Sequence, residues 1–223
     1  MGSTFNANHF GFLLLGAAWT IGLTVIAFIG GGLLGFLVAL GRVSSIALLR
    51  WALAAYVQLV QGTPLLVLIF LMYFGVAMAG FEFGPLAAAG LSLTIYVSAY
   101  IGEIWRGCIE SVPRTQWEAA ECLPLTKIQR MRLVVLPQAF KIATPPTVGF
   151  MVQIVKNSSL ASVVGFVELT RAGQLVNNSV FEPLVVFLVV AVIYFALCYP
   201  LSWWSRRLEA RLGVHAPVQS EPA

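Results

Sequence analysis

The stretch "EAAECLPLTKIQRMRLVVLPQA" occupies residues 118–139 and differs from the sequence on either side of it. Its charged residues are Glu118, Glu121, Lys127, Arg130 and Arg132, whereas the chain as a whole is 59% hydrophobic. A chain this apolar keeps one polar, helix-prone segment in its middle. The fold therefore depends on which structure the apolar sequences before and after this segment form, and on where the segment lies relative to them.

The composition is that of an integral membrane protein. Only 10% of the 223 residues are charged, against about 25% in a soluble domain, and the mean hydropathy is +0.89. The net charge of +4 comes from bases in short loops, which membrane topology explains without a nucleic-acid partner. The three cysteines have no metal-ligand spacing. The sequence predicts neither a metal site nor a cofactor bound by this chain.

Apolar runs long enough to cross a bilayer alternate with polar loops. They occupy residues 10–40, 51–79, 85–105, 139–155 and 183–204. Lys and Arg concentrate after the first, third and fifth runs, and bases mark the cytoplasmic side. We predict an all-α membrane protein with about five spans, the N-terminus outside and the C-terminus inside. Residues 1–208 would form the membrane domain and residues 209–223 a disordered cytoplasmic tail.

By this topology the polar segment lies in the cytoplasm, between the third and fourth spans. Thr115 and Glu118 have the spacing of a capping box, and so do Thr126 and Gln129. Pro124 between them fits a helix start or a break but not a helix interior. We expect two short helices joined by a turn around residues 123–125. The hairpin is either an amphipathic connector on the inner membrane surface or a docking knob for a cytoplasmic partner.

Several motifs resemble the permease subunits of ABC transporters, in the branch that imports polar amino acids. The EAA loop of this family begins with Glu-Ala-Ala, continues through a Gly and ends with an apolar residue before Leu-Pro. The quoted stretch resembles it at its head, residues 118–120, and at its tail, residues 136–139. Three further blocks resemble this branch in the same order: "QGTPLLV" (61–67), "SAYIGEIWRGCIESV" (98–112) and "KNSSLASVVGFVELTRAGQ" (156–174). Pro124 departs from the usual Gly, so the turn must use negative φ. Asn157 departs from a frequent Asp.

The resemblance implies a mechanism and a set of partners. Such a permease binds no ATP itself, and this sequence has no phosphate-cradling G-x-x-x-x-G-K-[ST] loop; ATP and Mg would be bound by a partner ATPase. The other implied partners are a second permease subunit (a copy or a homologue), an extracytoplasmic solute-binding protein, the amino acid and the lipid of the bacterial inner membrane. The chain would transport without being an enzyme. The residues implied to dock the ATPase are Glu118, Ala119, Ala120, Leu123 and Pro124.

The fourth run is the first candidate for a transport pathway, because an interrupted span often marks a binding site. Pro145 and Pro146 are expected to interrupt it, and "KNSS" (156–159) to end it. Asn157, Ser158 and Ser159 could then offer donors and acceptors to a carboxylate or an amide. The alternative is a plain helix end at the outer interface.

The second and third runs supply further pathway candidates. Gln61 and Thr63 precede Pro64, which would free backbone carbonyls in the second run or simply kink it. Ser98 and Gly102 share a face of the third run. Glu103 follows, and an acid inside a span is by default a functional candidate, although it could instead pair with Arg106 three residues on.

Two other classes of protein compete with this interpretation. An ATP-independent secondary transporter or channel could use the same spans, but it would have no use for a capped cytoplasmic knob. An intramembrane enzyme needs a Ser–His pair, two carboxylates or a metal cluster inside the bilayer. Both histidines lie outside the apolar runs, so the sequence argues against an enzyme and predicts no catalytic residue.

Overall fold

The structure is a computed structural model that describes residues 5–212, all of whose regular elements are helical. Three helices are long and apolar enough to cross a membrane: α1 (Ala7–Arg42), α5 (Pro85–Glu110) and α10 (Pro183–Leu212). Two bent pairs raise the possible number of spans to five. The predicted all-α membrane fold is confirmed. Helix α10 enters the predicted tail as far as Leu212, and residues 213–223 lie outside the described residues.

The first bent pair is the predicted second span. Helix α2 (Ala47–Gly62) meets α3 (Leu65–Phe70), which continues through a π-helical turn (Leu71–Gly75) into α4 (Val76–Met78). The two halves are bent by 100°. Pro64 lies at the bend and lacks the N–H that a continuous helix would need. The second run is therefore two helical pieces with a sharp bend between them, not one straight helix.

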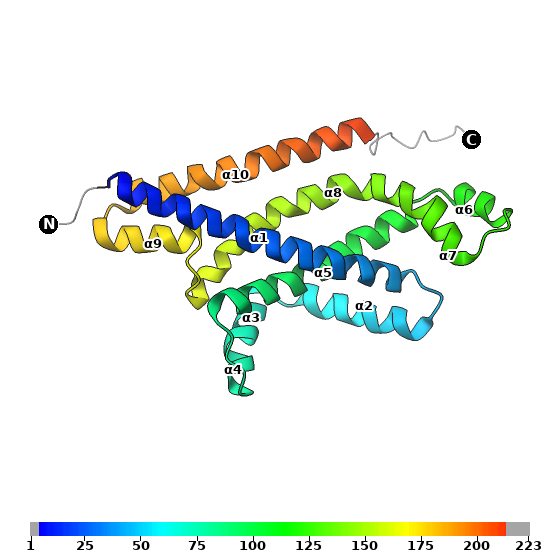
Figure 1. Cartoon of the computed structure of the whole chain (residues 1–223), viewed down its shortest axis with the longest axis horizontal. Helices are drawn as coiled ribbons and strands as arrows, with labels where there is room; N and C mark the ends of the chain where they lie inside the picture. The colour runs from blue at the N-terminus through cyan, green and yellow to red at the C-terminus, as the bar shows by residue number, and fades with distance from the viewer. Residues whose placement is uncertain (1–4, 213–223) are drawn as a thin grey trace.

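The second bent pair begins at the polar hairpin. Helices α6 (Arg114–Glu121) and α7 (Lys127–Arg130) form the hairpin, and a π-helical turn (Met131–Val135) leads into α8 (Leu136–Asn157). A 3-10 segment (Ser158–Val164) then precedes α9 (Leu169–Val180), which is bent by 52° from the preceding helical segment. The hairpin lies at one end of the bundle, and α9 and the beginning of α1 lie at the other (Figure 1).

Helix α8 corrects one expectation about the fourth span. Pro145 and Pro146 lie inside α8 and do not interrupt it. Helix α10 packs along this part of α8, where the Ser205 hydroxyl donates a hydrogen bond of 3.0 Å to the Pro145 carbonyl. Neighbouring helices commonly make proline tolerable within a membrane helix in this way. The α-helix does end at "KNSS", because α8 stops at Asn157, but the chain continues as the 3-10 segment and the bend lies further on, at residues 165–168.

Small residues bring α1 and α5 into the closest helix contact of the bundle. A Cβ placed on Gly31 would lie 2.4 Å from the Val97 Cβ, and one on Gly35 would lie 2.9 Å from the Ile101 Cβ. Val97 and Ile101 belong to the main apolar core. Because neither glycine has a side chain, the two backbones approach closely enough to hold α1 and α5 as one unit.

Candidate functional site

The hairpin is anchored to the bundle by one apolar face. Trp117 of α6 packs on a buried cluster formed where α1, α5 and α8 end or begin. Ala120 is 2% exposed, and Gln138 of α8 donates to Gln116 of α6 at 3.4 Å. The Arg130 guanidinium and the Glu121 carboxylate, 2.7 Å apart, tie α7 to α6. The two short helices therefore form one projection that packs against the membrane bundle.

Of the two predicted capping boxes, one is confirmed and one is wrong. Thr126 Oγ1 accepts from the Gln129 amide at 3.3 Å, and Gln129 Oε1 accepts from the Thr126 amide at 2.9 Å. Helix α6 instead begins at Arg114, directly after Pro113, so Thr115 lies inside the first turn and cannot cap it. Among the described residues only Gly80, Gly165 and Phe181 have positive φ. The turn at Pro124 thus uses negative φ, as expected.

The outer side of the hairpin leaves four of the five expected docking residues free. Glu118, Ala119, Leu123 and Pro124 are exposed, and Leu123 is 53% exposed. Ala120 is the exception, because its methyl group is buried inside the hairpin and cannot reach a partner. An exposed acid beside a small residue and an unburied leucine gives a surface suited to a protein groove.

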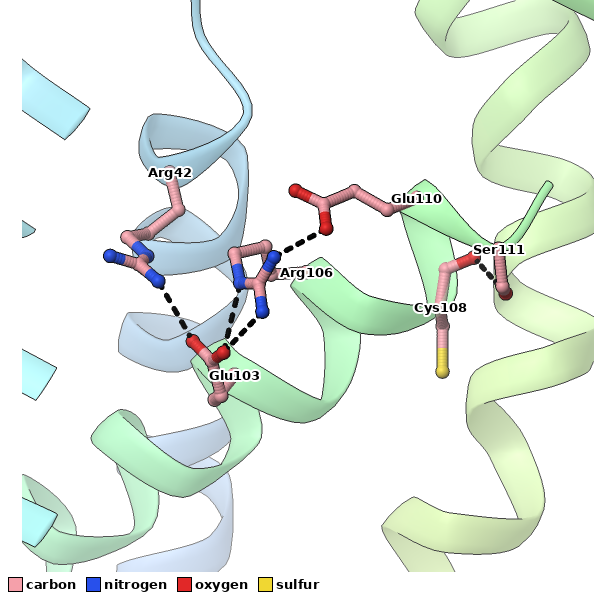
Figure 2. A network of polar contacts seen from close by, with 6 residues as sticks. All are labelled: Arg42, Glu103, Arg106, Cys108, Glu110 and Ser111. Carbon is pink, nitrogen blue, oxygen red and sulfur yellow. Dashed lines mark hydrogen bonds and ion pairs between the residues drawn. The ribbon is translucent and has the colours of Figure 1, made fainter. Parts of the chain in front are cut away.

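Ion pairs fix the ends of α1 and α5 next to the hairpin. The Arg42 guanidinium lies 3.2 Å from one carboxylate oxygen of Glu103, and Arg106 binds the other oxygen and also Glu110 (Figure 2). Ser111 donates to the Cys108 carbonyl at 2.8 Å, which closes the last turn of α5. The structure contains the Glu103–Arg106 pair, which was the alternative to a pathway role for Glu103, whereas sequence reasoning missed Arg42. Glu103 is thus held by two bases at the end of its span.

The polar end of α8 offers amide groups more than hydroxyl groups. Gln153 Nε2 donates to Asn157 Oδ1 at 3.2 Å, and both side chains retain further donors and acceptors. Ser158 is fully buried and donates to the Val155 carbonyl at 2.8 Å, and Ser159 donates to the Lys156 carbonyl at 2.7 Å. The two hydroxyl hydrogens are therefore already used by the backbone of the same segment.

Aromatic rings flank this region and were not singled out from the sequence. Tyr100 of α5 stacks on Phe150 of α8 with ring centroids 5.4 Å apart, and Tyr96 lies 4.5 Å from Tyr100. All three rings are half-buried. Two tyrosines four residues apart on α5 share one face of that helix, and this signal could have found them. The α5–α8 contact thus combines aromatic faces with the polar end of α8.

Ser98 and Gly102 do not join that surface. Ser98 Oγ lies 2.5 Å from Tyr56 Oη of α2, and a Cβ on Gly102 would lie 2.7 Å from Val38 Cγ1 of α1. Each is two residues from Tyr96 or Tyr100, which corresponds to the opposite side of a helix with about 3.6 residues per turn. These two small residues pack α5 against α1 and α2.

The break in the second span lies near the break in the fourth. Thr63 Oγ1 donates to the Leu59 carbonyl at 2.8 Å, and Gln61 is half-buried. The elements that follow the two breaks, α3 and the 3-10 segment after α8, contact each other and share one apolar core. The structure therefore brings together the two interrupted spans, although Glu103 belongs to the ion cluster at the hairpin end.

A buried carboxylate that sequence reasoning overlooked organises α9. Glu168 is fully buried and accepts three hydrogen bonds of 2.8 Å, from the amides of Thr170 and Arg171 and from the Tyr194 hydroxyl. It is the N-cap of α9, and Tyr194 connects it to α10. A buried acid is tolerated when its oxygens are fully bonded. Its position directly before an amphipathic helix was the available sequence signal.

Together these features define a multi-pass membrane permease: a helical bundle with two bent spans and a packed polar hairpin at one end. No group of three His, Cys or acidic side chains suited to a metal occurs within residues 5–212. The chain belongs to the family described as the binding-protein-dependent transport system inner membrane component, whose sequence profile matches residues 31–214.

Curated relatives and a solved structure agree with this assignment. The chain is 35% identical over 204 residues to the probable amino-acid ABC transporter permease protein YckA of Bacillus subtilis (strain 168), covering 92% of this chain and 90% of that protein. It is 38% identical over 205 residues to the probable glutamine ABC transporter permease protein GlnM of the same organism, covering 92% and 95%. A crystal structure of an amino acid ABC transporter with histidines superposes with a TM-score of 0.87 at 31% identity, covering 94% of this chain and all of that one. The chain is therefore a permease subunit of the ABC importer class.

Proposed function

We propose that this chain carries a polar amino acid across the bacterial inner membrane and that a separate ATPase drives it through the hairpin α6–α7. The observation that carries the proposal is the hairpin itself. It projects from the bundle (Figure 1), and its inner face packs on a buried apolar cluster. Its outer face exposes the side chains of Glu118, Ala119 and Leu123. A connector that merely joined two spans would not need a tied and capped projection.

The proposed topology places the hairpin in the cytoplasm, the N-terminus outside and the C-terminus inside. The helix ends on the hairpin side carry Arg42 of α1 and Arg50 of α2 as well as the bases of the hairpin, which is the distribution expected of a cytoplasmic surface. A cytoplasmic ATPase could then reach Glu118, and a solute-binding protein would meet the opposite end, where α9 lies. A second permease subunit would complete the pathway.

The polar end of α8 supports a polar amino acid as the substrate. Gln153 and Asn157 provide amide donors and acceptors, and Tyr96 and Tyr100 provide aromatic faces with hydroxyl groups. A zwitterion with a polar side chain can bond to all of these groups, while nothing in this set would favour a purely apolar solute. The names of the relatives, which refer to amino acids and to glutamine, support the same class.

Charge reversal at Glu118 tests the hairpin. The Glu118 side chain is exposed, and its carboxylate forms no hydrogen bond or ion pair with the described residues, so Glu118→Lys should change the folding free energy by no more than about 0.5 kcal/mol. The tagged chain, purified from its native membrane in mild detergent, should retain an ATP-binding subunit that the variant loses. Glu82→Lys is the matched control, because Glu82 is also exposed but lies in the loop before α5.

Each outcome of that pull-down is informative. An ATPase bound equally well by wild type and Glu118→Lys would refute the docking surface. An ATPase lost from both variants would show a general effect of charge reversal.

In proteoliposomes containing the whole importer, Asn157→Ala should lower amino-acid uptake without releasing the ATPase. Unchanged uptake by that variant would exclude the polar end of α8 from the pathway.

A further inference from the structure

A groove runs between the end of α1 and the hairpin. Its volume is about 560 Å³, and its apolar floor includes Phe36, Leu40 and Leu136. Ile128 stands at its edge with 79% of its surface exposed. Large exposed apolar side chains at the end of a membrane helix normally insert among lipids.

The rim of this groove is positively charged. Lys127, Arg130 and Arg132 line it, and the one acid among its lining residues, Glu121, is already paired with Arg130. Lys127 and Arg132 are exposed and form no ion pair within residues 5–212. The Ser44 hydroxyl also lines the groove and has no hydrogen-bond partner among the described residues. Two free bases and an unpaired hydroxyl form a rim suited to an anion with several oxygen acceptors.

The groove continues toward the membrane interior. A second groove of about 440 Å³ shares Phe36 and Leu136 with the first and is lined almost wholly by apolar groups of α1, α5 and α8. Trp105 forms part of its wall, with its ring in edge contact with Phe36 and Phe140 at centroid distances of 5.4 and 5.5 Å. Gly32 leaves it open on the α1 side, because a Cβ there would meet nothing within 4 Å. The combined shape has a cationic head and a long apolar tail.

We propose that the two grooves together bind one anionic phospholipid, with its headgroup phosphate between Lys127 and Arg132 and an acyl chain along Phe36 and Trp105. This inference rests on the membrane location of the chain and does not depend on the proposed amino acid. A second copy of the chain is a poorer occupant. A two-fold contact through this surface would bury the same basic rim of both copies in one interface, and like charges brought together are destabilising when the one acid of each rim, Glu121, is already paired.

Native mass spectrometry of the tagged chain, purified with the subunits it retains, tests the site. Samples are delipidated gently and incubated with phosphatidylglycerol or with phosphatidylcholine of identical acyl chains. We expect one phosphatidylglycerol to be retained per chain and phosphatidylcholine to be lost. The double variant Lys127→Gln/Arg132→Gln should retain it roughly 30-fold more weakly, from two bases facing an anionic headgroup. The control Lys141→Gln/Arg211→Gln removes two exposed bases outside the groove and should bind as wild type.

A second variant separates a lipid from a free anion. Gly32→Leu fills the apolar groove without altering charge, so it should also weaken phosphatidylglycerol retention, and inorganic phosphate should not compete. Equal retention of the two lipids, or a double variant that binds as wild type, would overturn the proposal. Competition by phosphate together with full binding by Gly32→Leu would assign the rim to a free anion instead. Loss of a second permease subunit from the double variant, with lipid retention unchanged, would assign the surface to that subunit.

Discussion

Replacing Gly31 by alanine should loosen the contact between α1 and α5, because the structure leaves no room there for one methyl group. The added Cβ would lie 2.4 Å from the Val97 Cβ, 2.5 Å from its Cγ1 and 2.8 Å from the Thr94 carbonyl oxygen. Non-bonded carbon atoms attract each other only at separations of about 3.5 Å or more. The helices must therefore separate by about 1 Å, or Val97 must leave its place in the main core.

The magnitude follows from comparison with the neighbouring glycine. Gly32 lies on the same helix, one residue further, and a Cβ there meets nothing within 4 Å. Both substitutions gain the same helix propensity, about 1 kcal/mol relative to glycine, and restrict the unfolded chain equally. The difference between the two variants is then the overpacking cost alone, about 1–3 kcal/mol. For a chain of this length, about 2 kcal/mol corresponds to a melting temperature lower by roughly 4–8 °C.

Thermal unfolding of the two variants and the wild type is measured in the same detergent. The readout is size-exclusion chromatography of samples heated in steps. Gly31→Ala should melt several degrees below Gly32→Ala, which should match or exceed the wild type. Gly35→Ala should resemble Gly31→Ala, because its Cβ would lie 2.9 Å from the Ile101 Cβ. Equal melting of Gly31→Ala and Gly32→Ala would refute the close contact between α1 and α5.

Three further perturbations probe the site. In Glu168→Gln, an amide NH₂ group would face hydrogen-bond donors that a carboxylate oxygen now accepts from, so the free energy of unfolding should fall by about 2–3 kcal/mol. The exposed control Glu82→Gln should melt as wild type. Equal stability of the two variants would contradict the buried network. Glu103→Gln should cost about 1 kcal/mol in a thermal melt, because its partners are partly exposed, and should leave the selectivity of amino-acid uptake unchanged; altered selectivity would place Glu103 in the pathway instead. Spin labels at the exposed residues Thr115 and Lys156 should keep their mutual distance when ATP is added to the assembled importer, as measured by pulsed electron resonance, and a change of more than a few ångströms would show that α8 bends.

Hydropathy was sufficient to predict the spans but not their breaks. A run of apolar residues specifies that a segment enters the bilayer, and the five runs correspond to the three long helices and the two bent pairs. Whether a proline breaks a helix depends on its neighbours. Pro64 marks a 100° bend, whereas Pro145 and Pro146 lie inside α8 under the cover of α10. Only tertiary packing distinguishes these cases.

Site residues were predictable where one local pattern determines geometry. Thr126 and Gln129 cap α7 as their spacing indicates, but α6 begins two residues earlier than predicted, directly after Pro113, so Thr115 is not its N-cap. On α5 the sequence showed a groove of small residues without showing which neighbour fills it. Helices α1 and α2 fill it, so the face toward α8 belongs to Tyr96 and Tyr100. Periodicity identifies a face of a helix, but not the partner that covers it.

The hairpin and the polar end of the fourth span are two ends of one helical segment. From Lys127 the backbone passes through α7 and the π-helical turn into α8, and α8 alone extends about 33 Å at 1.5 Å per residue. It carries no break before Asn157. Its hairpin end is clamped to α1 and α5 by the buried cluster around Val135, and α1 and α5 are clamped to each other by Gly31 and by the Arg42–Glu103 ion pair. Under the proposed function, a push on the hairpin would reach α8 through the packing of Trp117 on the cluster around Val135 and through the Glu121–Arg130 ion pair. We therefore expect the bundle to move as a body and to carry Asn157 with it when the separate ATPase acts on Glu118.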